Sequence, residues 1–344
     1  MKKLVILGGG FAGAKIAKAL EKKFEVTLID SKDYYEFTPG ILRSIVYPKH
    51  LKKIQVLHRH YLHKSKILNE CAIYVNNKSV KTKKSNLKFD YLIIALGSSY
   101  NTPFKEKEVV VATRGEHLRN HYKKLSKAKH ITIVGGGIVG VELAGEISDF
   151  YKDKKITLVH KHDSLMERNH GKTISHAEKF LKKRGVKILY NEEVKEYNKK
   201  ILTTNKGTKI KSDLTFICTG ITPNFQSLKK YFSKELNEKG QIIVNEYLQV
   251  KGYDNIFAAG DITSIKEEKL AQNAEKQAGI VIKNLKNLED KKSLIKYNSK
   301  PRIMIISLGR FNGIFQYRRL IITGVIPGIL KTLVEWKTMI KYRF

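Results

Sequence analysis

Cysteine is scarce in this chain of 344 residues, where only Cys71 and Cys218 occur. Two cysteines so far apart exclude a disulfide framework and a zinc pattern, so we predict no metal site and a reducing compartment. Long apolar runs are missing as well, since no window reaches the roughly 18 apolar residues that a membrane-spanning helix needs. The short apolar run at residues 4–7 predicts a buried strand rather than a secretory signal. These absences favour a globular chain in the cytoplasm.

Acidic residues are few beside basic ones, with 32 against 66 and a net charge of +34. Such a surface attracts anions, for example lipid headgroups, nucleic acid or phosphorylated substrates. A compositional bias that leaves a merely solvated basic surface explains the charge equally well. Aromatic and basic residues are not interleaved as in nucleic-acid readers, so we predict no nucleic-acid partner. The length and the 42% of hydrophobic residues suit two domains with sizeable cores.

A glycine-rich turn lies directly after the first predicted strand. Its glycines have the spacing G-x-G-x-x-G: Gly8, Gly10 and Gly13. We predict a helix over residues 12–22 and a second strand, FEVTLID, that ends at Asp30. The glycines permit a tight turn, a close approach of pyrophosphate and close helix packing, and the helix N-terminus faces the anion. Asp30 can hold a ribose hydroxyl, so the segment predicts a dinucleotide site.

The same pattern occurs again after a predicted strand at residues 130–134. Its glycines are Gly135, Gly137 and Gly140. A helix is predicted through about Tyr151, and the next strand, KKITLVH, ends in His160 and Lys161 where an acid would be expected. An acid there repels the 2′-phosphate of NADPH, whereas basic groups can pair with it. We expect this site to accept NADPH alongside NADH; the alternative is one more basic patch.

Three further segments combine a strand with a glycine turn: FDYLIIALGSS at residues 89–99, SDLTFICTGITPN at 212–224 and YDNIFAAGDIT at 253–263. Their turn glycines are Gly97, Gly220 and Gly260. Asp261 follows the last of these, where it can reach a bound flavin dinucleotide.

Two dinucleotide folds in one chain predict two nucleotides. One fold would hold FAD tightly, and the other would hold NAD(P)H that comes and goes, with hydride passing between them. We predict an α/β fold of two Rossmann-like, three-layer domains. The expected division is an FAD domain at 1–103 and 226–300, an inserted NAD(P)H domain at 104–225, and a C-terminal segment at 301–344.

These segments resemble the two-dinucleotide-fold flavoprotein superfamily over nearly the whole chain. Within it, the chain is similar to type II NADH dehydrogenases and especially to the ferroptosis-suppressor and apoptosis-inducing-factor-like quinone reductases. Four stretches carry the closer resemblance: VGGGIVGVELAGEI, LVHKHDSLMERN, ISLGRFNGIFQ and EWKTM. The resemblance implies NAD(P)H oxidation through FAD with a membrane quinone as acceptor, and no feature suggests proton pumping.

The resemblance also implies roles for single residues. Glu142 would lie near nicotinamide and flavin, to orient the nucleotide or help deliver protons to quinone; a helix-surface glutamate is the alternative. Gln272, in KLAQNAEKQAG, would lie beside flavin and quinone, and Lys269 would stabilise the reduced flavin electrostatically. Pro39, in DYYEFTPGIL, would let the backbone lie against the flavin ring.

Two family features have no clean counterpart in this sequence. A redox C-x-x-x-x-C pair is absent, and none is needed where hydride moves directly from nicotinamide to flavin. Cys218 is most simply a small buried hydrophobe. Lys331 is the nearest match to the family's C-terminal lysine, but Pro327 and Gly328 interrupt the register, so proton delivery is left open.

The C-terminal tail predicts a basic amphipathic helix that starts at Pro327. At about 100° per residue, one face collects its apolar side chains: Ile329, Leu330, Leu333, Trp336, Ile340 and Phe344. Basic residues beside this face favour attachment to an anionic membrane surface, on the cytoplasmic side and without crossing. The alternative is a helix that covers the protein's own core or a second copy in a homodimer.

Two enzyme classes fit this pattern. The first is a membrane-attached NAD(P)H:quinone oxidoreductase. The second is a soluble NAD(P)H-dependent flavoprotein that reduces an acidic carrier such as a ferredoxin or rubredoxin, which would dock on the basic surface.

Overall fold

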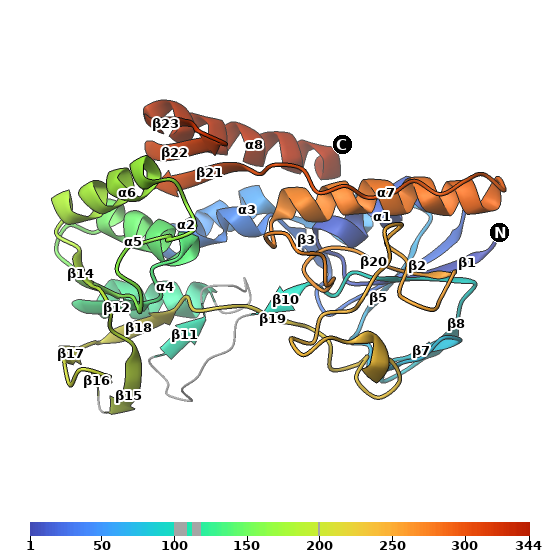
Figure 1. Cartoon of the computed structure of the whole chain (residues 1–344), viewed down its shortest axis with the longest axis horizontal. Coiled ribbons are helices and arrows are strands. Elements are labelled where there is room, and N and C mark those ends of the chain that lie inside the picture. The colour runs from blue at the N-terminus through green and yellow to red at the C-terminus, as the bar shows by residue number, and fades with distance from the viewer. Residues whose placement is uncertain (100–108, 112–117, 199) are drawn as a thin grey trace.

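Two parallel sheets form the body of the molecule (Figure 1). The computed structural model describes residues 1–99, 109–111, 118–198 and 200–344. The strands of the second sheet come from a stretch of chain that lies between strands of the first. The predicted α/β fold with parallel sheets is confirmed.

The first sheet has the strand order β20-β9-β1-β2-β5 with every neighbour parallel. Its strands are β1 (Lys3–Leu7), β2 (Glu25–Asp30), β5 (Lys66–Asn69), β9 (Tyr91–Ile94) and β20 (Ile256–Ala258). Successive side chains point to opposite faces, so Leu4 and Ile6 pack on one side and Val5 and Leu7 on the other. Both faces therefore need a cover.

Helices cover one face of this sheet and a small antiparallel sheet covers the other. The helices are α1 (Phe11–Leu20) and α7 (Ala271–Glu289), which pack against each other. The small sheet consists of β6 (Tyr74–Val75), β7 (Ser79–Lys81) and β8 (Asn86–Lys88). Val75 and Val80 share a buried cluster with Val5 and Leu7, so the small sheet covers the second face of the parallel sheet.

The second sheet repeats this plan with the order β11-β18-β12-β13-β14. Its strands are β11 (Val109–Val111), β12 (His130–Val134), β13 (Lys155–Val159), β14 (Lys187–Leu189) and β18 (Leu214–Ile217). Its helices are α4 (Leu118–Lys127), α5 (Ile138–Phe150) and α6 (Gly171–Lys183). The antiparallel strands β15 (Val194–Asn198), β16 (Ile201–Thr204) and β17 (Lys209–Lys211) pack on the opposite face.

We call each parallel sheet with its covering elements one half of the molecule, and two short strands join the two halves. These strands, β10 (Ser98–Ser99) and β19 (Thr222–Pro223), pair antiparallel. The two segments of chain that connect the sheets therefore lie side by side. Smaller elements follow β2 in the first half: β3 (Tyr34–Glu36), η1 (Thr38–Gly40), α2 (Ile41–Val46), η2 (Pro48–His50), α3 (Leu51–Ile54), β4 (Gln55–Leu57) and η3 (His58–His60). A further short helix, η5 (Ser233–Glu235), precedes β20.

The C-terminal segment is an antiparallel sheet followed by a long helix. It consists of β21 (Ile303–Leu308), β22 (Asn312–Tyr317), β23 (Leu320–Gly324) and α8 (Val325–Arg343). The prediction that this helix starts at Pro327 is wrong by two residues. Gly324 precedes it with a φ of 103°, and Pro327 falls in the first turn, where no N–H partner is needed.

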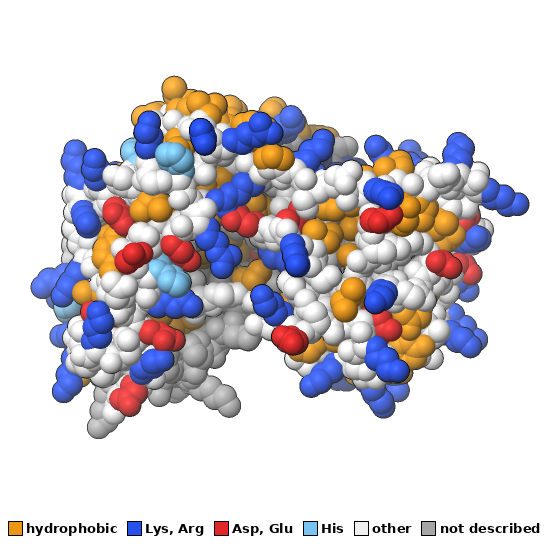
Figure 2. All heavy atoms as spheres, in the orientation of Figure 1, with side chains coloured by type: hydrophobic (Ala, Val, Ile, Leu, Met, Phe, Trp, Pro, Cys, Tyr) orange, Lys and Arg blue, Asp and Glu red, His pale blue; other side chains and the backbone are white. Residues whose placement is uncertain are grey.

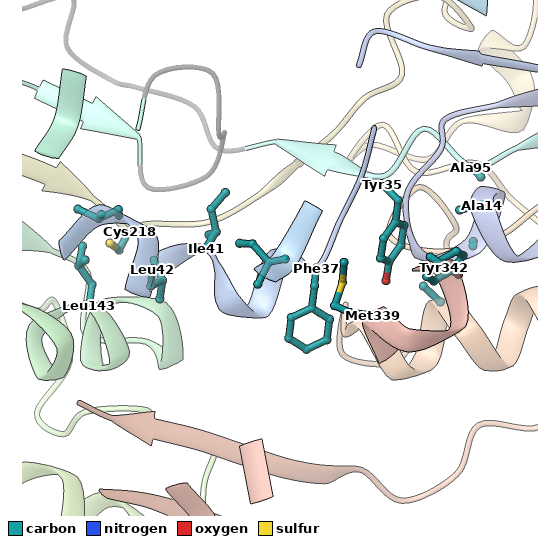
Figure 3. Close-up of a cluster of buried hydrophobic side chains, with 14 of the residues drawn as sticks. Ala14, Tyr35, Phe37, Ile41, Leu42, Ala95, Leu143, Cys218, Met339 and Tyr342 are labelled. Atoms are coloured by element: carbon teal, nitrogen blue, oxygen red, sulfur yellow. The ribbon is translucent and has the colours of Figure 1, made fainter. Parts of the chain in front are cut away.

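The helix α8 lies across both halves of the molecule (Figure 1). It contacts β21 and β22 at one end and α3 and β4 at the other. Figure 3 shows its Met339 and Tyr342 beside Tyr35 and Phe37 of the first half. Among the residues that the structure describes, no helix is long and apolar enough to cross a membrane.

Candidate functional site

The first glycine turn joins β1 to α1 at the carboxyl end of the first sheet. A Cβ on Gly13 would lie 1.8 Å from the carbonyl oxygen of Gly8, so only glycine lets the helix pack this closely. By contrast, no heavy atom lies within 4 Å of a Cβ built on Gly10. Close packing beside open space at a helix N-terminus fits a pyrophosphate group.

Asp30 ends β2 and is tied to this turn. Its Oδ2 atom accepts a hydrogen bond from the Gly9 N–H at 2.5 Å, and Oδ1 accepts one from the Lys32 N–H at 2.8 Å. Burial would raise the pKa of Asp30, but His58 and the two backbone N–H groups hold it below its usual value. A charged carboxylate is thus kept where a dinucleotide places its ribose.

A second carboxylate, Asp261, follows β20 at the same edge of the sheet. Its Oδ2 atom accepts a hydrogen bond from the Ser98 hydroxyl at 2.6 Å, and burial raises its pKa. Gly97 and Gly260 lie in the turns beside these two residues, and Pro39 lies in η1. The open turn, the buried carboxylate of Asp30 and the partly buried carboxylate of Asp261 fit a flavin dinucleotide.

The second glycine turn copies the first in backbone geometry. A Cβ on Gly140 would lie 1.9 Å from the carbonyl oxygen of Gly135, and the space around Gly137 is open within 4 Å. Gly220 lies in the turn between β18 and β19, and its surroundings are also open. These residues fit a second dinucleotide.

His160 stands one residue past β13, where the first half carries an acid. Its ring is buried, and Nδ1 accepts a hydrogen bond from the Gly136 N–H at 3.1 Å. Burial lowers the pKa of His160, although the Glu167 carboxylate opposes this. Lys161, the other residue expected to meet a 2′-phosphate, has an exposed side chain.

Glu142 lies in α5 and is buried rather than on the helix surface. Its Oε1 atom accepts hydrogen bonds from the Ser307 N–H at 2.8 Å and the Ser307 hydroxyl at 3.2 Å. The Lys331 ammonium of α8 donates to the same oxygen and lies 3.2 Å from the Ser307 hydroxyl. The expectation that Pro327 and Gly328 put Lys331 out of register is wrong, because the helix runs continuously through them.

Gln272 lies in the first turn of α7, and Lys269 lies two residues before this helix begins. The Lys269 ammonium donates to the carbonyl oxygen of Thr263 at 2.6 Å, and burial lowers its pKa against the attraction of Asp261. The Gln272 amide donates to the carbonyl oxygen of Ile303 at 2.7 Å, which ties α7 to β21. Lys269 thus belongs to the surroundings of Asp261, whereas Gln272 anchors the C-terminal sheet.

A cavity of about 690 Å³ opens beside α8, and its other walls come from residues 43–53 of the first half, from the end of α5 and from the turn between β21 and β22. Its aromatic lining is Tyr47, Phe150, Phe311, Trp336 and Phe344. Its charged lining is Arg43, His50, Lys53, Arg310, Glu335 and Arg343. A narrow pocket shares Arg43, His50, Thr332 and Glu335 with this cavity and reaches Pro39, Gly40, Ser307 and Lys331. The cavity therefore points from the surface toward the Glu142–Lys331 pair.

Two polar pairs line the inner end of this cavity. His50 Nε2 lies 3.1 Å from Glu335 Oε2, and both side chains are largely buried. Arg43 Nη2 lies 2.9 Å from Glu146 Oε1. No sequence motif pointed to any of these four residues. One signal was available, because Lys331 and Glu335 are four residues apart on a helix and so share its inner face.

Comparison with known proteins places this geometry in context. Residues 2–278 match the family model described as pyridine nucleotide-disulphide oxidoreductase. Apoptosis-inducing factor homolog A of Dictyostelium discoideum is 36% identical over 92% of this chain and 85% of its own length. Ferroptosis suppressor protein 1 of Mus musculus is 30% identical over 98% of this chain and 95% of its own length.

Solved structures of lower identity have the same fold. The sulfide:quinone oxidoreductase of Aquifex aeolicus superposes with a TM-score of 0.87 at 20% identity, over 100% of this chain and 92% of that one. NDH2 of Plasmodium falciparum, solved with NADH, gives a TM-score of 0.87 at 19% identity over 100% and 96%. Both matches include the C-terminal segment.

Proposed function

The chain belongs to the pyridine nucleotide-disulphide oxidoreductase family, and we propose on that premise that it is an FAD-dependent NAD(P)H:quinone oxidoreductase. When bound, FAD supplies a group that takes hydride from the nicotinamide and returns two electrons to an acceptor. The first glycine turn, Asp30 and Asp261 would hold FAD. The second turn and His160 would hold NAD(P)H, so the two nucleotides would be bound by separate halves of the chain.

The cavity beneath α8 is the proposed quinone site. Aromatic side chains line its outer part, which suits an apolar ring and tail. Polar pairs line its inner part, which suits the two carbonyl oxygens of a quinone. The Aquifex protein of the same fold carries a quinone in its name, which agrees with this choice of acceptor.

Quinone reduction consumes two protons, and two buried pairs can supply them. The Lys331 ammonium donates to Glu142 and lies 3.2 Å from the Ser307 hydroxyl, and His50 Nε2 lies 3.1 Å from Glu335 Oε2. A hydrogen-bonded donor within reach of the developing quinol oxygen raises the rate by about 10²- to 10⁴-fold in other enzymes. We therefore propose for Glu142 the predicted role in proton delivery, with Lys331 as its partner. The roles of Lys269 at the flavin and Gln272 at the quinone stay predictions.

The outer surface of α8 is the proposed membrane contact. Its exposed apolar side chains are Val325, Ile326, Ile329, Leu333, Val334, Trp336 and Phe344, and Leu320 and Ile322 of β23 extend the patch. Figure 2 shows hydrophobic side chains gathered over α8 and β23 with Lys and Arg beside them. An apolar patch rimmed by basic groups suits the interface of an anionic bilayer, from which a quinone could reach the cavity. Attachment at the cytoplasmic side and a homodimer stay predictions.

The observation that carries this proposal is the Glu142–Lys331 pair at the inner end of a cavity that opens beside an apolar surface. The test is an anaerobic visible spectrum of the purified holoprotein. NADH or NADPH should bleach the flavin, and a short-chain quinone should restore it. If the nucleotide bleaches the flavin and quinone does not restore it, the quinone assignment fails and reduction of a carrier protein takes its place.

Membrane attachment is tested separately. The variant Ile326→Ser/Ile329→Ser/Leu333→Ser should lose flotation with vesicles that contain anionic lipid, while it keeps activity with soluble quinone. Ile73→Ser, at another exposed apolar residue, is the matched control. Flotation that survives the triple substitution would contradict the proposed membrane contact.

A further inference from the structure

The two glycine turns use the same backbone donor for different partners. In the first half, the N–H of the middle glycine, Gly9, donates to Asp30. In the second half, the N–H of Gly136 donates to His160 Nδ1 at 3.1 Å. His160 therefore fulfils the structural part of the acid's role, which is to brace the turn. It cannot fulfil the chemical part, because an imidazole that accepts this bond has no free acceptor for a ribose hydroxyl.

The second nitrogen of His160 points to a carboxylate. Because Nδ1 accepts from Gly136, a neutral ring carries its proton on Nε2. That atom lies 3.4 Å from Glu167 Oε2, and it makes no hydrogen bond within the described part of the chain. The other oxygen of Glu167 lies 3.7 Å from His162 Nε2. The carboxylate that is missing from the end of β13 is thus present nearby, between two imidazoles.

Glu167 is held in place by the same turn. The N–H of Met166 donates to the carbonyl oxygen of Gly136 at 2.9 Å, and Met166 adopts a left-handed φ of 50°. The preceding residue, Leu165, is fully buried beside Gly136. The Glu167 side chain keeps 34% of its surface exposed, so a ligand at the turn can reach it.

We propose that Glu167 is the residue that sets nucleotide preference, by accepting a hydrogen bond from the 2′-hydroxyl of NADH and repelling the 2′-phosphate of NADPH. This inference rests on the proposed role of the second glycine turn as the NAD(P)H site. In this fold the adenosine ribose lies at the carboxyl end of the second strand, which is here the end of β13. The Glu167 carboxylate lies between His160 and His162, at 3.4 Å and 3.7 Å from their Nε2 atoms, and Lys161 extends to solvent. The protein therefore prefers NADH to NADPH, although the basic residues His160 and Lys161 follow β13.

The experiment compares nucleotide binding in the holoprotein and in Glu167→Gln. Isothermal titration calorimetry with NAD⁺ and NADP⁺ gives the ratio of the two Kd values without requiring hydride transfer. The wild type should bind NAD⁺ at least about 10-fold more tightly, and Glu167→Gln should reduce that ratio to about 1. Glu196→Gln removes one negative charge from an exposed site on β15 and should leave the ratio unchanged.

Three results decide between the claims. A wild type that binds NADP⁺ as tightly as NAD⁺, or a ratio that Glu167→Gln leaves unchanged, overturns the role of Glu167. A ratio that Glu196→Gln changes equally shows that net charge, not this contact, sets the preference. If the ratio shifts as expected but neither nucleotide bleaches the flavin, the role of Glu167 stands and the proposed oxidoreductase activity fails.

Discussion

The two glycine turns share one backbone geometry and differ in how the nearby carboxylate is held. The turns pack with the same close approach, 1.8 Å from a Cβ on Gly13 to Gly8 and 1.9 Å from one on Gly140 to Gly135. In the first site the carboxylate of Asp30 bonds the turn directly. In the second, His160 bonds the turn and Glu167 stands behind it with a third of its surface in solvent. The first arrangement suits a resident cofactor, and the second suits a nucleotide that exchanges.

The surroundings strengthen this contrast. Behind Asp30, the ring of His58 is hydrogen-bonded to the Tyr61 hydroxyl at 2.6 Å. Tyr342 of α8 lies against Tyr61 with ring centroids 4.9 Å apart and stacks on Tyr35 at 4.1 Å (Figure 3). The C-terminal helix thus braces the first site. Within the part of the chain that the structure describes, Tyr342 has no ring contact with the second site.

The largest expected effect comes from breaking each turn in the same way. Gly13→Ala should yield protein without flavin, because the added methyl group collides with the Gly8 carbonyl beneath the pyrophosphate site. Gly140→Ala should keep its flavin but lose nucleotide-dependent bleaching by at least about 100-fold, since the collision now lies in the other half. Flavin content and anaerobic bleaching rates are the measurements. Gly171→Ala, which adds a methyl group in open space, is the control. Equal flavin loss in both variants would contradict two separate sites.

A second variant separates the two half-reactions. Lys331→Met should slow flavin reoxidation by soluble quinone by about 100-fold, since it removes the proton donor bonded to Glu142. Bleaching by NADH should change by less than about 3-fold, because Lys331 bonds Glu142 and Ser307 rather than the glycine turns. Stopped-flow absorbance measures both rates. Lys337→Met, at an exposed position on the same helix, should leave both unchanged. If bleaching falls as far as reoxidation, Lys331 acts on both steps and the assignment to quinone is wrong.

Sequence patterns predicted what depends on local spacing. The turns, their strands and helices, and the apolar tail follow from glycine spacing and periodicity, and the structure has them within a few residues. Contacts between distant segments could not be obtained in this way. Glu142 and Lys331 are 189 residues apart and meet only because α8 folds over the second half. Glu167 lies near His160 because Met166 adopts a left-handed backbone conformation. Residue propensities do not predict such a conformation for a methionine.

The two sites should also differ in their response to acid. Burial lowers the pKa of His160, so its neutral form stabilises the fold. That contribution is complete above the unfolded pKa of about 6.5 and is lost as the pH falls through the lower folded value. Asp30, whose pKa is also lowered, keeps its contribution until the pH falls below about 4. The second half should therefore lose protection from hydrogen exchange first, as the pH falls below about 6.5.

The variant His160→Asn sharpens this test, because its side-chain oxygen can still accept from Gly136. The loss of protection in the second half over this pH range should shrink in His160→Asn. The exposed His63→Asn should behave as the wild type. A wild type whose two halves lose protection together would show that the pKa of His160 does not govern this response.

The smallest expected effect concerns the two cysteines, one in each half. Burial raises the pKa of the Cys218 thiol to about 12, whereas Cys71 is exposed. At pH 8 only about one Cys218 in 10⁴ would be a thiolate, so a thiol reagent should label Cys71 at least 100-fold faster. Cys71→Ser should remove the fast phase, and both cysteines of the wild type should react in denaturant. Cys218→Ala should retain turnover within about 2-fold, since hydride transfer needs no thiol. A Cys218→Ala variant that holds flavin but does not turn over would instead make this thiol part of the reaction.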